Sequence, residues 1–139
     1  MNKKQKGHLA EAKILANLLE LDYTVLQPFG DNEKYDLVIE SERGFHRIQC
    51  KYGKYKENGS INVQLNSSRI NMNGQYKKTY TKEDIDYFAT WCQKVNEVFL
   101  FSVDECGTRS FTIRLEKPKN NQSKGVNLAK NYLLENYEF

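Results

Sequence analysis

The chain has 139 residues, of which 39% are hydrophobic and 28% are charged, and its formal net charge is +3. This size fits one domain over residues 1–139, and this composition excludes a disordered chain. No stretch approaches the roughly 20 apolar residues of a membrane span, and no apolar signal core follows the basic residues 1–7, so we expect a cytoplasmic protein.

The three cysteines, Cys50, Cys92 and Cys106, are an odd number at wide spacing, and there are only two histidines. This pattern argues against a disulfide framework and against a zinc site. The mild positive charge permits nucleic-acid binding without indicating it, because clusters of lysine are more often a solvated surface.

The first predicted element is a helix over residues 3–20, in which apolar side chains recur at helical spacing. Glu11 lies three and four residues before Ile14 and Leu15, so it shares the apolar stripe of this helix. Burying an unpaired carboxylate is costly. The position of Glu11 therefore requires an explanation beyond packing.

Strands follow the helix, and the pattern predicts them at 23–26, 35–40, 45–51, 61–65, 87–92, 98–103 and 111–115. The polar stretches 52–59 and 66–81 are expected to be loops, the second of them long. Thr81 and Asp84 have capping-box character, which predicts a short helical turn, and 125–136 has the spacing of a closing helix. The expected fold is α/β (α+β), with a central mixed sheet flanked by helices.

Four polar side chains are expected to meet at one corner of this sheet. Asp36 begins one strand and Lys51 ends the next, so antiparallel pairing around the turn at 41–44 brings them together. Gln49 and Lys51 are two residues apart and project from the same face. The preceding helix can place Glu11 at the same corner.

This set suits phosphodiester hydrolysis with Mg²⁺, an ion that prefers oxygen ligands and retains several waters. Asp36 is the expected main ligand, and the side-chain oxygen of Gln49, the backbone carbonyl of Cys50 and the carboxylate of Glu11 complete the protein's share. Lys51 would assist deprotonation of the attacking water or stabilise the charged phosphorane. We expect Mn²⁺ to substitute for Mg²⁺.

Tyrosines and lysines interleave farther along the chain, a pattern that suits contact with DNA. The residues expected at phosphates are Lys54, Lys56, Lys77 and Lys78. The residues expected at base edges are Arg69, Asn71, Asn73 and Gln75.

The motifs Glu11, Tyr35-Asp36 and Ile48-Gln49-Cys50-Lys51 resemble those of the PD-(D/E)XK nucleases. Over about residues 5–103, the chain looks most like the small endonucleases encoded in bacterial group I introns, and its core is similar to archaeal Holliday junction resolvases. The resemblance implies a restriction-endonuclease-like core and Mg²⁺-dependent, site-specific cleavage of double-stranded DNA by a homing enzyme. It also implies a homo-oligomer, a tetramer in preference to a dimer.

Two positions depart from the family pattern. Tyr35 stands where proline is common, and this departure is harmless because Asp36 carries the chemistry. Gln49 stands where the pattern has Asp or Glu, although intron-encoded members resemble this chain in using Gln-x-Lys. Two alternatives stay open: a junction-resolving nuclease that recognises branched DNA, and a catalytically inactive DNA-binding module that has kept the fold.

Overall fold

The computed structural model describes residues 1–71, 74–116 and 125–139. Helix α1 (Lys3–Glu20) begins at a capping box, in which the side chains of Asn2 and Gln5 each accept a 2.9 Å hydrogen bond from the other residue's N–H. Its buried residues are Ala10, Ile14 and Leu18. The predicted helix and its apolar stripe are therefore confirmed. No helix in the described parts of the chain is long and apolar enough to cross a membrane.

Seven strands form the main sheet: β1 (Thr24–Leu26), β2 (Leu37–Ser41), β3 (Gly44–Lys56), β4 (Ser60–Gln64), β7 (Tyr87–Cys92), β8 (Glu97–Ser102) and β9 (Ser110–Arg114). Their order is β1-β2-β3-β4-β9, with β7 paired to β3 and β8 paired to β7. The β3–β7 pair is parallel, and the other pairs are antiparallel. This is the mixed sheet that the sequence predicted. The expected loop at 52–59 is wrong in its first part, because β3 continues to Lys56 and pairs there with β4.

Strand β3 changes partners along one of its edges. Strand β7 pairs with β3 from Ile48 to Gly53, so it occupies one edge throughout this stretch. Strand β2 pairs with β3 up to Ile48, and β4 pairs with it from Gly53 onward, so both lie on the opposite edge. Between them, residues 49–52 of β3 have no strand neighbour on that edge among the described residues. We call this gap the open edge.

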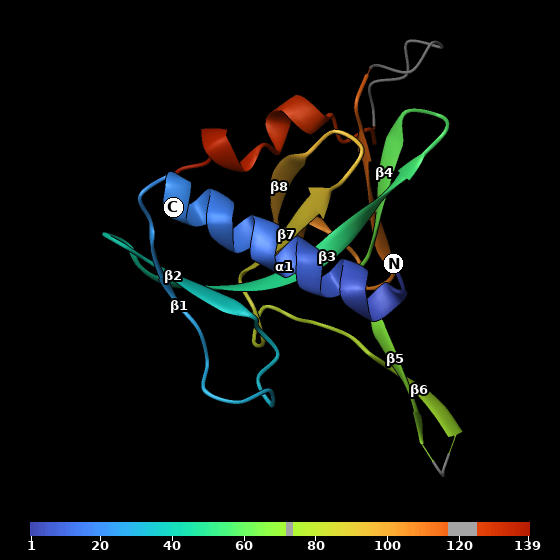
Figure 1. Cartoon of the computed structure of the whole chain (residues 1–139), viewed down its shortest axis with the longest axis horizontal. Coiled ribbons are helices and arrows are strands. Elements are labelled where there is room, and N and C mark those ends of the chain that lie inside the picture. Colours follow the sequence, from blue (N-terminus) through green and yellow to red (C-terminus); the bar gives the residue numbers. More distant parts are fainter. Residues whose placement is uncertain (72–73, 117–124) are drawn as a thin grey trace.

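The sheet separates two apolar layers. Helix α1 lies across one face (Figure 1), where Ile48 and Cys50 of β3 belong to the same buried cluster as the stripe of the helix. The other face is covered by aromatic side chains, among which Phe101 stacks on Phe88 and Phe111 with ring centroids 5.5 and 4.2 Å apart. The two faces of β3 therefore meet different surroundings.

A two-stranded ribbon projects from the body (Figure 1), made of β5 (Ser67–Asn71) and β6 (Gly74–Lys78). The expected loop over 66–81 is wrong in this part. The ribbon forms a sheet of its own, separate from the main sheet. Its sequence therefore has no need of the apolar alternation by which a half-buried strand is identified.

The C-terminal segment is not the closing helix that was expected over 125–136. It contains two short 3₁₀ helices, η2 (Ala129–Asn131) and η3 (Leu134–Asn136), whereas a third, η1 (Val103–Glu105), follows β8. The backbone of this segment bonds to the sheet instead: the Leu100 N–H donates to the Tyr132 carbonyl at 2.7 Å, and the Arg114 N–H donates to the Asn127 carbonyl at 2.7 Å. Among the described residues, α1 is the one α-helix that flanks the sheet.

Candidate active site

An acidic pocket of about 310 Å³ lies between α1 and the segment that leads into β2. Its carboxylates are Glu11, Asp31, Glu33 and Asp36. Glu11 is half-buried on the inner side of α1, as the apolar spacing predicted. The structure therefore brings Glu11 and Asp36 into one pocket from two elements.

Asp36 is fixed to the open edge of β3 by two hydrogen bonds. Its backbone N–H donates to the carbonyl of Ile48 at 2.8 Å, and its Oδ2 accepts from the N–H of Cys50 at 2.8 Å. The side chain thus takes the place of a strand partner just beyond the end of β2. A carboxylate has about four acceptor positions, so this bond leaves capacity for a further ligand.

The charges in this pocket oppose one another. Burial raises the pKa of Glu11 above its ordinary value, and the charge of Asp36 raises it further, whereas His8 lowers it. Burial also raises the pKa of the Cys50 thiol, with added contributions from Asp36 and Glu11. The thiol therefore stays protonated near neutral pH and is not a nucleophile. A cation between the two carboxylates would relieve their repulsion.

Gln49 and Lys51 leave β3 on the face opposite to α1. Strand alternation requires this, because Cys50 between them belongs to the cluster under α1. Accordingly, Lys51 Nζ lies 5.1 Å from the ring centroid of Tyr80, a residue of the second cluster. The expected corner is thus divided between the two faces of the sheet. Glu11 shares a pocket with Asp36 on the side of α1, whereas Gln49 and Lys51 leave β3 on the opposite face, and Gln49 lines neither this pocket nor the groove described below.

The donor atoms around this edge suit a hard divalent cation. In the described residues, no group of three or more His, Cys, Asp and Glu side chains is placed to hold a metal ion. A site here therefore needs oxygens of other kinds, which the amide of Gln49 and the carbonyl of Cys50 carry. The N–H and the carbonyl of one strand residue lie on the same edge, so the Cys50 carbonyl faces the side from which Asp36 binds the Cys50 N–H. Mg²⁺ is usually bound by one or two carboxylates with several waters, which fits this set.

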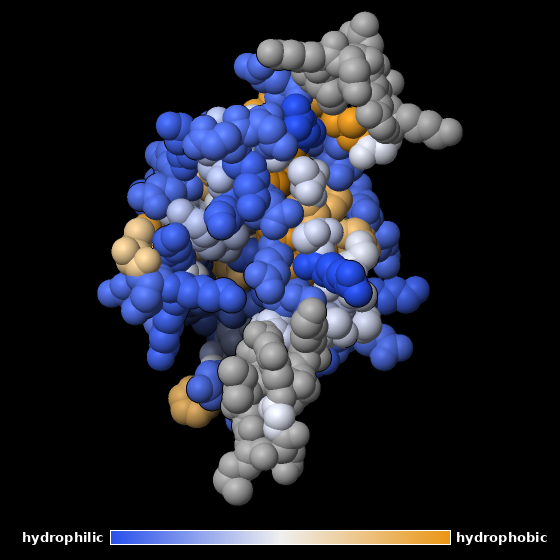
Figure 2. Space-filling view, turned by 90° about the vertical axis from the view of Figure 1, so that its right-hand side faces the viewer, coloured by the Kyte–Doolittle hydropathy of each residue, from blue (hydrophilic) through white to orange (hydrophobic). Residues whose placement is uncertain are grey.

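A basic groove of about 960 Å³ has Cys50 and Lys51 in its wall, and the bond from Cys50 N–H to Asp36 Oδ2 connects this wall to the acidic pocket. The groove also contains the predicted DNA-binding residue Lys54, which is exposed on β3. Lys56 is exposed at the end of the same strand and is not part of the wall. The face that carries the start of α1 is largely hydrophilic (Figure 2).

Most of the other predicted DNA-binding residues lie on the projecting ribbon. Arg69 and Asn71 are in β5, and Gln75, Lys77 and Lys78 are in β6. Asn73 lies outside the described residues. The segment taken for a loop is therefore a β-ribbon, an element that fits the major groove of DNA.

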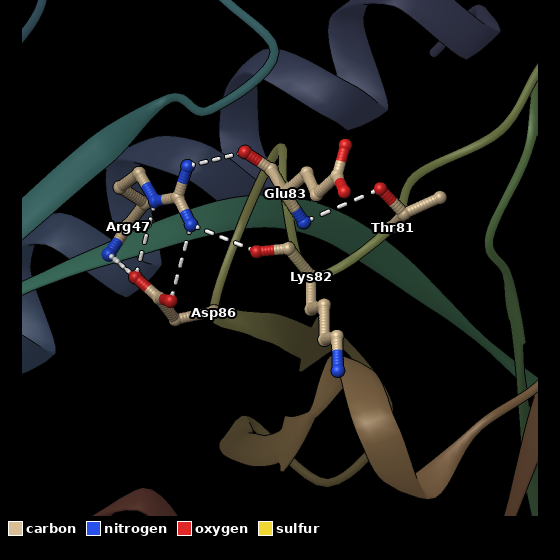
Figure 3. Close-up of polar contacts among 5 residues, drawn as sticks. All are labelled: Arg47, Thr81, Lys82, Glu83 and Asp86. Carbon is tan, nitrogen blue, oxygen red and sulfur yellow. Dashed lines mark hydrogen bonds and ion pairs between the residues drawn. The ribbon is translucent and has the colours of Figure 1, made fainter.

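Polar contacts between Arg47 and residues 82–86 fix the segment that leads from the ribbon back to the sheet (Figure 3). Arg47 of β3 donates through Nε and Nη2 to the Asp86 carboxylate, both at 3.2 Å, and through Nη1 and Nη2 to the carbonyls of Glu83 and Lys82 at 2.7 and 2.9 Å. Burial acts to raise the pKa of Asp86, but the bonds and charge of Arg47 outweigh it and lower the pKa. The predicted capping contact at this turn is present, because Thr81 N–H donates to Asp84 Oδ2 at 3.0 Å.

Several charged residues at these two hollows do not stand out in the sequence. Asp31 and Glu33 belong to a segment with the composition of a loop, and their acidity beside Asp36 was the available signal. The basic groove also contains Lys3, Lys4 and Lys6, a cluster of the kind that the sequence alone assigns to a solvated surface.

This fold has the restriction-endonuclease-like core that the sequence predicted. The sequence profile of the PD-(D/E)XK endonucleases matches residues 1–135, and the chain belongs to this family. Nucleases of this family typically use divalent metal ions. Among solved structures, the chain is similar to a bacterial homing endonuclease, I-Ssp6803I, with a TM-score of 0.74 and 25% sequence identity over 96% of this chain and 89% of that chain. No curated protein matches the sequence.

Proposed function

We propose that this endonuclease cuts double-stranded DNA at specific sites with Mg²⁺, or Mn²⁺ in its place, and that it acts as an intron-encoded homing enzyme. The observation that carries the proposal is the 2.8 Å bond from Cys50 N–H to Asp36 Oδ2. This bond ties the acidic pocket to the stretch of β3 that carries Gln49 and Lys51. The name of the structural neighbour supports the homing role.

Asp36 and Glu11, with the amide oxygen of Gln49 and the carbonyl of Cys50, would hold the ion. When bound, Mg²⁺ lowers the pKa of water and offsets charge on the phosphate. The Cys50 N–H orients Asp36, and the strand fixes the spacing of Gln49 and Lys51. The side chain of Lys51 would stabilise negative charge on the phosphate or take part in deprotonating the attacking water.

Substrate recognition is assigned to the ribbon and the basic groove. The ribbon would read base edges through Arg69, Asn71, Asn73 and Gln75, and the lysines at positions 54, 56, 77 and 78 would meet phosphates. One chain supplies one cleavage centre, so cutting both strands requires more than one copy. We propose a tetramer in preference to a dimer, and sedimentation equilibrium tests this: a monomer at the concentrations that cut DNA would contradict it.

Plasmid cleavage tests the activity. The wild-type protein should nick or linearise supercoiled DNA with Mg²⁺ and not with EDTA. Lys51→Ala should lower the rate at least about a hundredfold, as expected when a group that stabilises transition-state charge is removed. Lys94→Ala is a matched control, because Lys94 is exposed on the turn between β7 and β8. Cleavage by Lys51→Ala at the wild-type rate would overturn the active-site assignment.

The same assay separates the alternatives. Cleavage of four-way junctions in preference to linear duplex would favour a junction resolvase. A protein that binds DNA but fails to cut it with either Mg²⁺ or Mn²⁺ would be the inactive module, with Gln49 the departure that explains it. A binding readout keeps these outcomes distinct: Mg²⁺ should raise the melting temperature of the wild-type protein more than that of Asp36→Asn.

A further inference from the structure

The basic groove is lined by residues of four elements, namely α1, β3, β4 and the start of β5. The start of α1 supplies Lys3, Lys4 and Lys6, β3 supplies Lys54, and β4 supplies amides from Asn62 and Gln64. Its wall includes Cys50 and Lys51 of the open edge. Positive charge and hydrogen-bonding amides thus line one groove, and its wall residue Cys50 is bonded to Asp36 of the acidic pocket.

The lysines of α1 stand where helix electrostatics disfavours them. The start of a helix carries partial positive charge, so acidic residues are favoured in its first turn, and α1 has none there. Among the described residues, none of Lys3, Lys4, Lys6 and Lys54 forms an ion pair. The capping box nonetheless orders this turn, and Lys6 Nζ lies 5.6 Å from the ring centroid of Tyr52 on the groove wall. The positive charge at this turn is therefore held in place and not neutralised by the protein.

Gly7 is a second unfavourable choice on the same wall. It lies inside α1, where glycine weakens a helix relative to alanine. Apart from its chain neighbours and the backbone of its own helix, a Cβ atom on Gly7 would meet no atom within 4 Å, so packing against other parts of the chain does not require glycine here. A glycine that opens a helix surface into a charged groove suits close approach by a ligand backbone.

We propose that the basic groove holds the phosphate backbone of one DNA strand beside the bond that is cut, with Lys3, Lys4 and Lys6 at phosphates and Gly7 as the point of closest approach. The identity of the polyanion as DNA rests on the proposed function. The groove adjoins Lys51, so a strand lying in it leads directly to the open edge. These residues form a second surface for contact with DNA, in addition to the ribbon.

Salt dependence of DNA binding tests the lysines. Affinity for a labelled duplex is measured in EDTA, without cleavage, over a range of salt concentrations. The triple variant Lys3→Gln/Lys4→Gln/Lys6→Gln should reduce the slope of log affinity against log salt by about 2 to 3 units, at roughly 0.9 for each phosphate that the protein no longer neutralises. The control removes the same charge elsewhere, at Lys13, Lys94 and Lys130. Equal slopes for the two triple variants would overturn the proposal.

Gly7→Ala tests the close approach, because the proposal predicts opposite effects on two measurements. The melting temperature should rise, since alanine favours the helix, and DNA affinity should fall several-fold, since the methyl group enters the groove. Unchanged affinity with a raised melting temperature would refute the role of Gly7. Plasmid cleavage keeps failures apart: an inactive protein whose DNA binding still depends on these residues would refute the nuclease proposal and leave the groove assignment standing.

Discussion

Replacing Gly53 with alanine should destabilise the fold at the end of the open edge. A Cβ atom on Gly53 would lie 2.8 Å from Ile61 Cγ2 and 2.9 Å from Thr90 Oγ1, and both neighbours are fully buried. Overpacking of this kind costs about 1–3 kcal/mol, and alanine returns about 0.4–1 kcal/mol by restricting the unfolded chain. We therefore expect a net decrease of about 1–2 kcal/mol in the free energy of unfolding.

Urea denaturation measures this decrease, and Gly7→Ala is the matched control. The same substitution at Gly7, where a Cβ meets nothing within 4 Å, should stabilise the protein by about 0.5–1 kcal/mol. Adding Thr90→Ala to Gly53→Ala removes one of the two clashing atoms and should recover part of the stability, a coupling on the order of 1 kcal/mol. A Gly53→Ala protein as stable as the wild type would refute the crowding that we assign to this junction of β3, β4 and β7.

Three further predictions concern the candidate active site and the contacts of Arg47. Glu11→Gln should raise the free energy of unfolding at pH 8 and change it little at pH 4. The pKa of Glu11 is raised in the folded state, so the folded protein binds the proton more tightly, and the stability of the wild type falls as the pH rises from 4.5 through the raised pKa. Urea titrations of the variant at both pH values check the sign. Arg47→Met, which keeps the apolar stem and breaks the contacts to Asp86, should cost about 2 kcal/mol by urea denaturation, because charged hydrogen bonds are removed at a partly exposed site. Asp36→Asn should abolish plasmid cleavage with a smaller effect on stability, since an amide oxygen can still accept from Cys50 N–H; retained cleavage would contradict its assignment as the main metal ligand.

The sequence predicted the elements whose apolar residues have a regular period. Helix α1 and strands β7 and β8 were found because their buried faces repeat at 3.6 or 2 residues or run without interruption. The closing helix over 125–136 failed for a physical reason. Its apolar residues have helical spacing, but the backbone there bonds to the sheet, as the 2.7 Å bond from Leu100 N–H to the Tyr132 carbonyl shows. Tertiary pairing overrides local propensity in this segment.

The pocket shared by Glu11 and Asp36 could be predicted, because a carboxylate on an apolar stripe and an aspartate at a strand end are visible in the sequence. The division of the site between the two faces of the sheet could not be predicted. Alternation places Gln49 and Lys51 together, but where β2 stops and β4 begins along β3 depends on long-range pairing. The basic groove was missed for the same reason, since nothing local connects Lys6 on the first helix with Gln64 on β4.

Three features that disfavour folding lie at the acidic pocket and the basic groove. Burial and the charge of Asp36 raise the pKa of Glu11 and so disfavour its ionised form. Three lysines lie at the positive end of α1, and Gly7 weakens the same helix. Each has a substitution that should stabilise the free protein: Glu11→Gln, Lys→Gln at the first turn, and Gly7→Ala. Chance would scatter such defects over the surface, whereas selection for ligands retains them where a cation and a polyanion bind. If all three substitutions stabilise the protein and weaken metal or DNA binding, the acidic pocket and the basic groove form one functional site. A substitution that stabilises the protein and leaves full activity would show that its residue does not belong to this site.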